Sequence, residues 1–357
     1  MALSQLTQPI IVIGGGAFGT STAYHLFTKG YTNVTVLDRF PLPAFEAAGN
    51  DINKLDIWRD RIGLFAGLYH PSGWIIGVTD RSTPFVEASM RSAKTLGVDP
   101  PKLVSTEEIR EKWPVMNGGF AGWKSFWSPN AAWVNAREGI VRMAQEAINA
   151  GVKYASGSAE YAKKPLYDEN QACVGVKCAD GTSYFGSKII LAAGAAAGSL
   201  FGLENQVVAK GHAVGHIQLT PDEVEEYKDM PILDHLEGGT RYLHGPFHIN
   251  YTKSFNGISL PRYRSDNPRN GIPAVVEARQ RKWMEKCVPK LAHREWVETR
   301  ICWFLPVFGK YIVEMMERWT PGLELSDYTT NPHPEKLEDM NEMPGWGPVK
   351  SSLWANV

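Results

Sequence analysis

The chain has 357 residues, of which 43% are hydrophobic and 21% are charged, and its formal net charge is −1. This composition excludes a disordered chain, and the balanced charge gives no reason to expect a nucleic-acid or membrane partner. A chain of this length is too long for one ordinary core and predicts two domains. The 4 cysteines form no CxxC pair, so we expect neither a disulfide framework nor a metal site.

Neither end of the chain carries a recognisable targeting signal. The start, MALSQLTQP, lacks a basic region followed by an apolar run, and the last residues, WANV, are not a peroxisomal SKL-type signal. We therefore expect a cytoplasmic protein.

The N-terminal stretch contains a strand, a glycine-rich turn and a helix. Ile10–Ile13 is a short apolar run that is typical of a buried parallel strand. Gly14, Gly16 and Gly19 follow it as GxGxxG. The first glycine permits a tight turn, the second lets the backbone approach a pyrophosphate, and the third lets the helix pack closely on the strand. The helix predicted over Thr20–Lys29 would present its N-terminal N–H groups to an anion.

An acidic residue follows at the distance expected for a nucleotide. Gly30 can end the helix, and Asn33–Asp38 is the next predicted strand. At its end, the carboxylate of Asp38 can accept hydrogen bonds from ribose hydroxyls. Strand, turn, helix and acid in this order predict a dinucleotide site rather than a glycine turn of purely structural use.

The region after this unit favours a flavin over a nicotinamide dinucleotide. Asn135–Ala150 reads as an amphipathic helix that Gly151 ends. Four stretches then predict a small antiparallel meander that re-enters the parallel sheet: Val152–Ala159, Ala172–Ala179, Thr182–Gly186 and Lys188–Gly194. A simple nicotinamide domain would continue with strand–helix units instead. At Gly194 the backbone would come close to the cofactor a second time. The alternative is that Gly194 belongs to a well-packed strand end made of small residues.

Eight segments, in order along most of the chain, carry a resemblance to a family. They are IIVIGGGAFGTSTAYHL, AAGNDINK, GWKSFWSPNAAWVNAREGI, KIILAAGA, GHIQLTPDE, ISLPRYRSDNPRNGIP, ETRICW and LPVFGKYIVE. On these segments the chain resembles the fungal fructosyl amino acid oxidases (amadoriases). These belong to the D-amino-acid-oxidase and monomeric-sarcosine-oxidase group of FAD-dependent oxidoreductases.

The resemblance implies FAD, and it implies oxidation of a C–N bond. The substrate would be a fructosyl amino acid or a similar N-substituted amino acid, and O2 would be reduced to H2O2. A saccharopine- or pipecolate-type oxidase is the alternative within this class. A shortened flavin-binding remnant without turnover is the alternative outside it. We expect a monomer whose partners are a small-molecule amine and O2.

The resemblance also implies particular site residues. The segment AGNDINK passes beside the flavin ring in such enzymes, so Asn50, Asp51, Asn53 and Lys54 are carried over as neighbours of the cofactor. Lys54 is the catalytic candidate, because its cation would favour the anionic reduced flavin; a solvated loop lysine is the alternative. Cys302, in ETRICW, matches the position where this group attaches FAD through a thioether, and a buried core cysteine is the alternative.

The implied fold is α/β, with a two-dinucleotide-type FAD-binding Rossmann-like domain, a β-meander and a smaller α+β substrate domain. The expected FAD-binding domain is discontinuous, and the substrate domain is reduced. The expected ranges are 5–54, 131–215 and 300–326 for the FAD-binding domain, 55–130 and 216–299 for the substrate domain, and 327–357 for a C-terminal tail.

The chain is shorter than this family in three places. They lie after Lys54, before Ile258 and directly after Trp303. The second would hold a lysine above the flavin, and Lys253 does not match its motif. The third would hold a parallel strand and a glycine-rich contact loop, although Phe304–Glu317 still reads as a closing helix. Loss of a parallel strand would leave an unpaired sheet edge.

Overall fold

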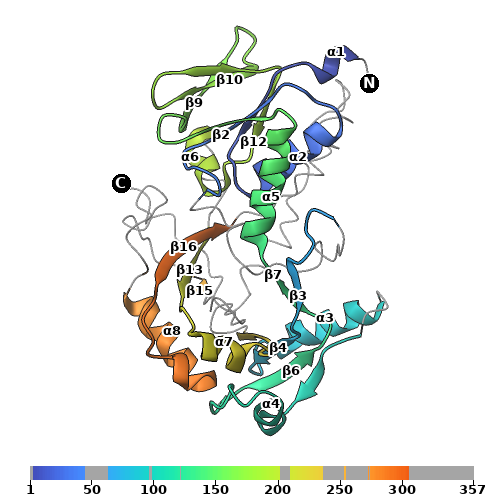
Figure 1. Ribbon diagram of the computed structural model, residues 1–357, viewed down its shortest axis with the longest axis vertical. Helices are drawn as coiled ribbons and strands as arrows, with labels where there is room; N and C mark the ends of the chain where they lie inside the picture. Colours follow the sequence, from blue (N-terminus) through green and yellow to red (C-terminus); the bar gives the residue numbers. More distant parts are fainter. Residues whose placement is uncertain are drawn as a thin grey trace.

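The computed structural model describes residues 3–44, 63–95, 99–120, 122–201, 210–235, 253–254, 272 and 274–304. These residues form two bodies that follow one another along the long axis of the molecule (Figure 1). The upper body in this view contains the N-terminal strands and the meander, and the lower body contains the remaining sheets with their helices.

A four-stranded parallel sheet lies at the centre of the upper body, in the order β12-β1-β2-β8. Its strands are β1 (Ile10–Ile13), β2 (Val34–Asp38), β8 (Lys153–Ser156) and β12 (Lys188–Leu191). All four residues of β1 are buried, as a central parallel strand requires. Within the described residues, β12 pairs with β1 on one side and forms an edge of the sheet.

Helices cover one face of this sheet. They are α2 (Ala17–Thr28) and α5 (Ala136–Asn149), which contact each other, and the short α1 (Leu3–Leu6) precedes β1. Because side chains alternate along a strand, Val12 and Val36 face these helices and pack with Leu26 and Ala147. The predicted C-terminal ends of both helices are confirmed, since Gly30 has φ +91° and Gly151 has φ +98°. The predicted start at Thr20 is wrong, because α2 begins at Ala17, directly after the glycine turn.

The meander covers the other face. Its strands are β9 (Ala162–Tyr167), β10 (Cys173–Cys178) and β11 (Ser183–Phe185), in the order β11-β10-β9. Val176 and Cys178 pack against Ile11 and Ile13 of β1. Two short helices follow β12, namely η2 (Gly194–Ala196) and α6 (Ala197–Phe201).

The sequence assigned the wrong first strand to the meander. Val152–Ala159 was expected there, but β8 lies within this stretch and pairs in parallel with β2. The first meander strand is β9, whose sequence AKKPLY has no apolar alternation. Proline is tolerated on an edge strand, and β9 has a strand neighbour, β10, on one side only among the described residues.

The lower body is built on a four-stranded mixed sheet in the order β14-β4-β6-β5. The strands are β4 (Trp74–Val78), β5 (Lys102–Val104), β6 (Lys124–Ser128) and β14 (Ile232–His235). Its helices are α3 (Thr83–Thr95), α4 (Thr106–Lys112), α7 (Pro221–Tyr227), α8 (Ala274–Cys287) and η6 (Pro289–Leu291). The largest core cluster of the chain joins Ile75 and Leu233 of the sheet to Tyr227 and Trp283 of the helices. Cys287 is fully buried in this cluster.

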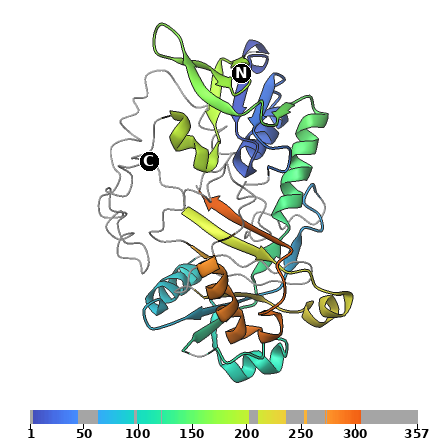
Figure 2. The same cartoon turned by 90° about the vertical axis from the view of Figure 1, so that its left-hand side faces the viewer.

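Two smaller sheets complete the fold. The antiparallel sheet β15-β13-β16 joins β13 (Lys210–His216), β15 (Lys253–Ser254) and β16 (Glu298–Phe304). The two-stranded ladder joins β3 (Tyr69–Pro71) to β7 (Ala132–Val134). In both views the end of β16 lies where the two bodies meet (Figures 1 and 2). Because β16 continues through Phe304, the helix predicted from that residue does not begin there, and 305–317 lie outside the described residues.

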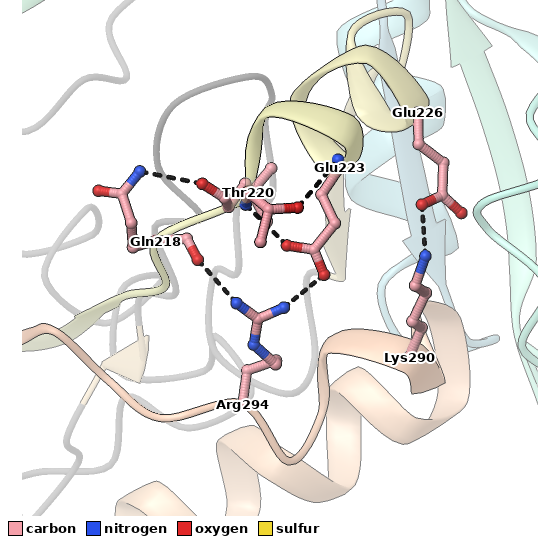
Figure 3. A network of polar contacts seen from close by, with 7 residues as sticks. Gln218, Thr220, Glu223, Glu226, Lys290 and Arg294 are labelled. Atoms are coloured by element: carbon pink, nitrogen blue, oxygen red, sulfur yellow. Dashed lines mark hydrogen bonds and ion pairs between the residues drawn. The ribbon is translucent and has the colours of Figure 1, made fainter.

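A polar network fixes the start of α7 in the lower body (Figure 3). Thr220 and Glu223 form a capping box, in which the Thr220 hydroxyl accepts from the Glu223 N–H and the Glu223 carboxylate accepts from the Thr220 N–H. Arg294 forms an ion pair with Glu223 and also donates to the carbonyl oxygen of Gln218 at 3.0 Å. The network therefore ties the segment before α7 to the segment after α8.

We expect Glu223→Gln to lower the free energy of unfolding by about 1–2 kcal/mol at neutral pH. The backbone bond from Thr220 is the main cause that lowers the pKa of Glu223 below its usual 4.5, and Arg294 adds to it. Since the folded-state pKa is the lower one, this stabilisation is present above pH 4.5 and is lost as the pH falls through the folded pKa. Urea unfolding measures this difference in the free energy of unfolding between the variant and the unsubstituted chain. The difference should be large at neutral pH and small well below pH 4.5.

The matched control for this prediction is Glu226→Gln. Glu226 pairs with Lys290, and both side chains are about half exposed, so its loss should cost about 0.5 kcal/mol or less. Equal losses in the two variants, or a Glu223→Gln loss that does not change with pH, would contradict the role given to Glu223.

Candidate cofactor-binding site

The carboxyl ends of three parallel strands bring the predicted glycine and acidic residues together. The N–H of Gly14, after β1, donates to the carbonyl oxygen of Leu37 in β2 at 2.7 Å. The N–H of Ala192, after β12, donates to the carbonyl oxygen of Ile13 at 2.8 Å. The turn at Gly14, the side chain of Asp38 and the turn at Gly194 therefore lie at one edge of the sheet, which is where open α/β sheets bind ligands.

Gly14 and Gly19 leave no room for a side chain. Gly14 has φ +107°, and a Cβ atom there would lie 2.4 Å from the carbonyl oxygen of Ala192. A Cβ atom on Gly19 would lie 1.6 Å from the carbonyl oxygen of Gly14. The start of α2 therefore packs directly on the turn that follows β1, and glycine is required at both positions.

The N-terminus of α2 is open to an anion. Gly16 is the N-cap residue, and no side chain among the described residues caps the helix. The first N–H groups of a helix have no partner within the helix, and together with the helix dipole they favour a negatively charged group. This is the arrangement that a pyrophosphate needs.

Asp38 lies beside this turn with both carboxylate oxygens engaged. Its Oδ2 accepts from the N–H of Gly15 at 2.6 Å, and its Oδ1 accepts from the N–H of Phe40 at 2.8 Å. Burial raises the pKa of Asp38 above its usual value, and the bonds from Phe40 and Gly15 and the charge of Arg39 oppose the rise. Each carboxylate oxygen keeps a further lone pair, so ribose hydroxyls can still donate to it.

The second glycine turn and the strand of Cys302 approach each other. Gly194 has φ +54°, and a Cβ atom there would meet nothing within 4 Å, so its backbone conformation rather than its packing calls for glycine. The turn η2, which begins at Gly194, contacts β16. Cys302 lies on β16 opposite His212 in the register. His212 and His216 both lie on strand β13.

Four predicted neighbours of the cofactor, namely Asn50, Asp51, Asn53 and Lys54, lie outside the described residues. The structure adds one residue that the sequence reasoning missed. Thr20 is fully buried, and its hydroxyl donates to the carbonyl oxygen of Gly15 at 3.0 Å. The sequence signal for this contact was that Thr20 is a polar residue on the otherwise apolar side of the predicted helix.

Other kinds of site receive no support from the residues that the structure describes. Within those residues, no cluster of three or more His, Cys, Asp or Glu side chains could hold a metal ion. None of the helices in the same ranges is long and apolar enough to cross a membrane. That the protein is a cytoplasmic monomer stays a prediction.

The glycine turn without room for side chains, the helix N-terminus without a side-chain cap and the partly buried acid define a dinucleotide-binding protein, and the meander indicates the flavin-binding type. The chain belongs to the family of FAD-dependent oxidoreductases called DAO, whose model matches residues 9–54 and 52–323. The α/β architecture is that of this family, and the protein is an FAD-dependent enzyme. The turn at Gly14 and the start of α2 up to Gly19, which we call the glycine cradle, fit the diphosphate of that cofactor.

Three similar proteins illustrate the relationship. L-saccharopine oxidase of Schizosaccharomyces pombe is 26% identical over 84% of this chain and 80% of its own. The fructosamine oxidase Amadoriase II of Aspergillus fumigatus matches with a TM-score of 0.74 at 26% identity, over 89% of this chain and 87% of its own. A modified fructosyl peptide oxidase of Aspergillus nidulans, in complex with FSA, matches with a TM-score of 0.72 at 30% identity, over 83% of this chain and 79% of its own.

Proposed function

We propose that the chain is an amine oxidase that oxidises the C–N bond of a fructosyl amino acid or a similar N-substituted amino acid, with O2 reduced to H2O2. The observation that carries this proposal is the glycine cradle at the start of α2 beside the partly buried Asp38. Bound FAD would serve as the acceptor of a hydride equivalent from the carbon next to the amine. Structural neighbours that act on fructosamines and fructosyl peptides support this substrate class.

Different residues at this site would bind different parts of the cofactor. The N–H groups at the start of α2 would bind the pyrophosphate, since Gly14 and Gly19 let the backbone come close to it. Asp38 would accept hydrogen bonds from the ribose hydroxyls. Following the family resemblance, AGNDINK would lie beside the ring, with Lys54 contributing a positive charge.

A covalent link at Cys302 belongs to the same proposal. The contact between β16 and the turn at Gly194 supports it, because it brings the strand of Cys302 to the sheet edge where the cradle lies. A thioether there would hold the flavin end of the cofactor while the cradle holds its adenosine end.

A saccharopine- or pipecolate-type oxidase is the second candidate function. The relative from Schizosaccharomyces pombe, an L-saccharopine oxidase, favours it. Both candidates oxidise a secondary amine, so the cofactor site is the same for both.

Peroxide release tests these candidates against one another. We expect the full chain loaded with FAD to produce H2O2 with fructosyl-valine or fructosyl-lysine, and to produce none when the same protein has been stripped of flavin. Peroxide with L-saccharopine or L-pipecolate alone would establish the second candidate. A flavin-loaded sample that releases no peroxide with any of the four compounds would contradict both oxidase functions for these substrates.

A further inference from the structure

The hydroxyl of Thr20 holds one peptide of the glycine turn. Thr20 is on the first turn of α2 and is fully buried. Its Oγ1 donates a hydrogen bond of 3.0 Å to the carbonyl oxygen of Gly15, five residues earlier in the chain. Since this side chain is excluded from solvent, water does not compete with the carbonyl for its hydroxyl proton.

This bond determines where the next N–H group points. The carbonyl of Gly15 and the N–H of Gly16 belong to one planar peptide unit, and in a trans peptide they point in opposite directions. The bond to Thr20 turns the carbonyl towards the buried side of α2. The N–H of Gly16 therefore points away from the buried side of α2, at the helix N-terminus, where no described side chain makes a cap hydrogen bond.

The other polar backbone group of Gly15 is held as well. Its N–H donates to Oδ2 of Asp38 at 2.6 Å. Side chains from α2 and from β2 thus fix the two sides of a residue that, as a glycine, would otherwise sample many backbone conformations. The conformation of the turn is set by the protein itself.

We propose that Thr20 is a positioning residue for the pyrophosphate of FAD. Its hydroxyl holds the Gly15–Gly16 peptide so that the N–H of Gly16 faces the phosphate before the cofactor binds. Preorganisation of this kind increases affinity because less freedom is lost on binding. The proposal rests on the dinucleotide site alone and is independent of the amine substrate.

The expected effect is moderate and specific. Removing the hydroxyl should weaken the binding of a diphosphate nucleotide about five-fold, which corresponds to about 1 kcal/mol, the net value of a neutral hydrogen bond. If Thr20 only stabilised the fold, its loss would lower the stability of the apoprotein and leave the affinity of the folded protein unchanged.

The test compares Thr20→Val with Thr22→Val. Thr22 lies on the same helix and is equally buried, but its hydroxyl has no hydrogen-bond partner among the described residues. The two variants therefore undergo the same chemical change and differ in the bond to the turn and in a side-chain interaction of Thr20 with Tyr154. Tyr154→Phe removes the second difference alone and should leave the ADP affinity unchanged. Thr20→Ser keeps the hydroxyl and should retain the original affinity. Thr20→Ala removes the hydroxyl without adding a methyl group and replaces Thr20→Val if that variant does not fold.

ADP is the probe, titrated into the full-length apoprotein by calorimetry. It carries the pyrophosphate and the ribose but no flavin ring, so it reports on the turn and not on Cys302 or the substrate. All samples, including the reference, carry Cys302→Ser so that flavin can be removed from each of them. Urea unfolding of each apoprotein gives its stability separately.

An ADP dissociation constant about five-fold higher in Thr20→Val or Thr20→Ala, with Thr20→Ser and Thr22→Val within about two-fold of the reference, would support the proposal. Unchanged affinity without the hydroxyl, equal losses in Thr20→Val and Thr22→Val, or a reference that does not bind ADP would overturn it. A reference that binds ADP while the native chain releases no peroxide would overturn the proposed oxidase function and leave this inference standing.

Discussion

Replacing Gly19 by alanine is expected to weaken FAD binding by about 100-fold. The added Cβ atom would lie 1.6 Å from the carbonyl oxygen of Gly14 and 3.3 Å from Cγ1 of Val12. The first of these is a backbone atom, so a rotation of a flexible side chain cannot relieve the overlap. The start of α2 would have to move away from β1, and the cradle for the pyrophosphate would open.

Two opposing contributions act on this variant. Alanine favours a helix by about 1 kcal/mol relative to glycine, so the substitution should stabilise α2 where space allows. Overpacking in a tight interior costs about 1–3 kcal/mol and occasionally more, and here it falls on the ligand cradle. The helix preference acts on the stability of α2 and not on the cradle, so an overpacking cost of about 3 kcal/mol at the cradle would lower the affinity for FAD about 100-fold.

The flavin-to-protein absorbance ratio of the purified full chain measures this effect. Gly119→Ala is the control, because a Cβ atom there would meet nothing within 4 Å and the backbone of Gly119 does not have a positive φ that disfavours alanine. It should retain the flavin content of the unsubstituted chain. A normal flavin content in Gly19→Ala would show that the turn at Gly14 does not form the cofactor cradle.

The second large effect is expected for Cys302→Ser. If the sulfur of Cys302 forms a thioether with FAD, acid precipitation of the unsubstituted protein should give a yellow pellet. The serine variant cannot form this bond, so its flavin should pass entirely into the supernatant. The absorption spectrum of the protein is recorded before precipitation, and those of the redissolved pellet and of the supernatant are recorded afterwards. Their flavin bands show where the flavin is.

Cys173→Ser is the matched control for this experiment. Cys173 is a free, half-buried cysteine at the start of β10, and its replacement should leave the pellet yellow. A yellow pellet in Cys302→Ser would place the link elsewhere. A yellow supernatant from the unsubstituted protein would show that FAD is held without a covalent bond.

The cradle was predictable because its physical requirements are local. A strand, a turn with positive φ and the start of a helix each leave a sequence signal within a few residues, and Gly14, Gly19 and Asp38 carry those signals. The ends of α2 and α5 were predictable for the same reason, since Gly30 and Gly151 both have positive φ.

Features set by tertiary pairing were not predictable in this way. β9 lacks an apolar alternation, because an edge strand of a meander need not bury alternate side chains. β8 was assigned to the meander because its parallel pairing with β2 leaves no signal in the local sequence. The bond from Thr20 to Gly15 depends on how α2 packs on the turn. The position of Cys302 opposite His212 depends on a register between strands far apart in sequence.

The approach of β16 to the turn at Gly194 has a consequence for how the protein unfolds. The cradle for the adenosine end of FAD is in the upper body, whereas β16 pairs with β13 where the two bodies meet. If FAD is held at both places, as proposed, it would span the two bodies and stabilise each of them in its folded state. We therefore expect the FAD-loaded protein to unfold in a single cooperative transition and the apoprotein in two, a difference that calorimetry of both forms would measure.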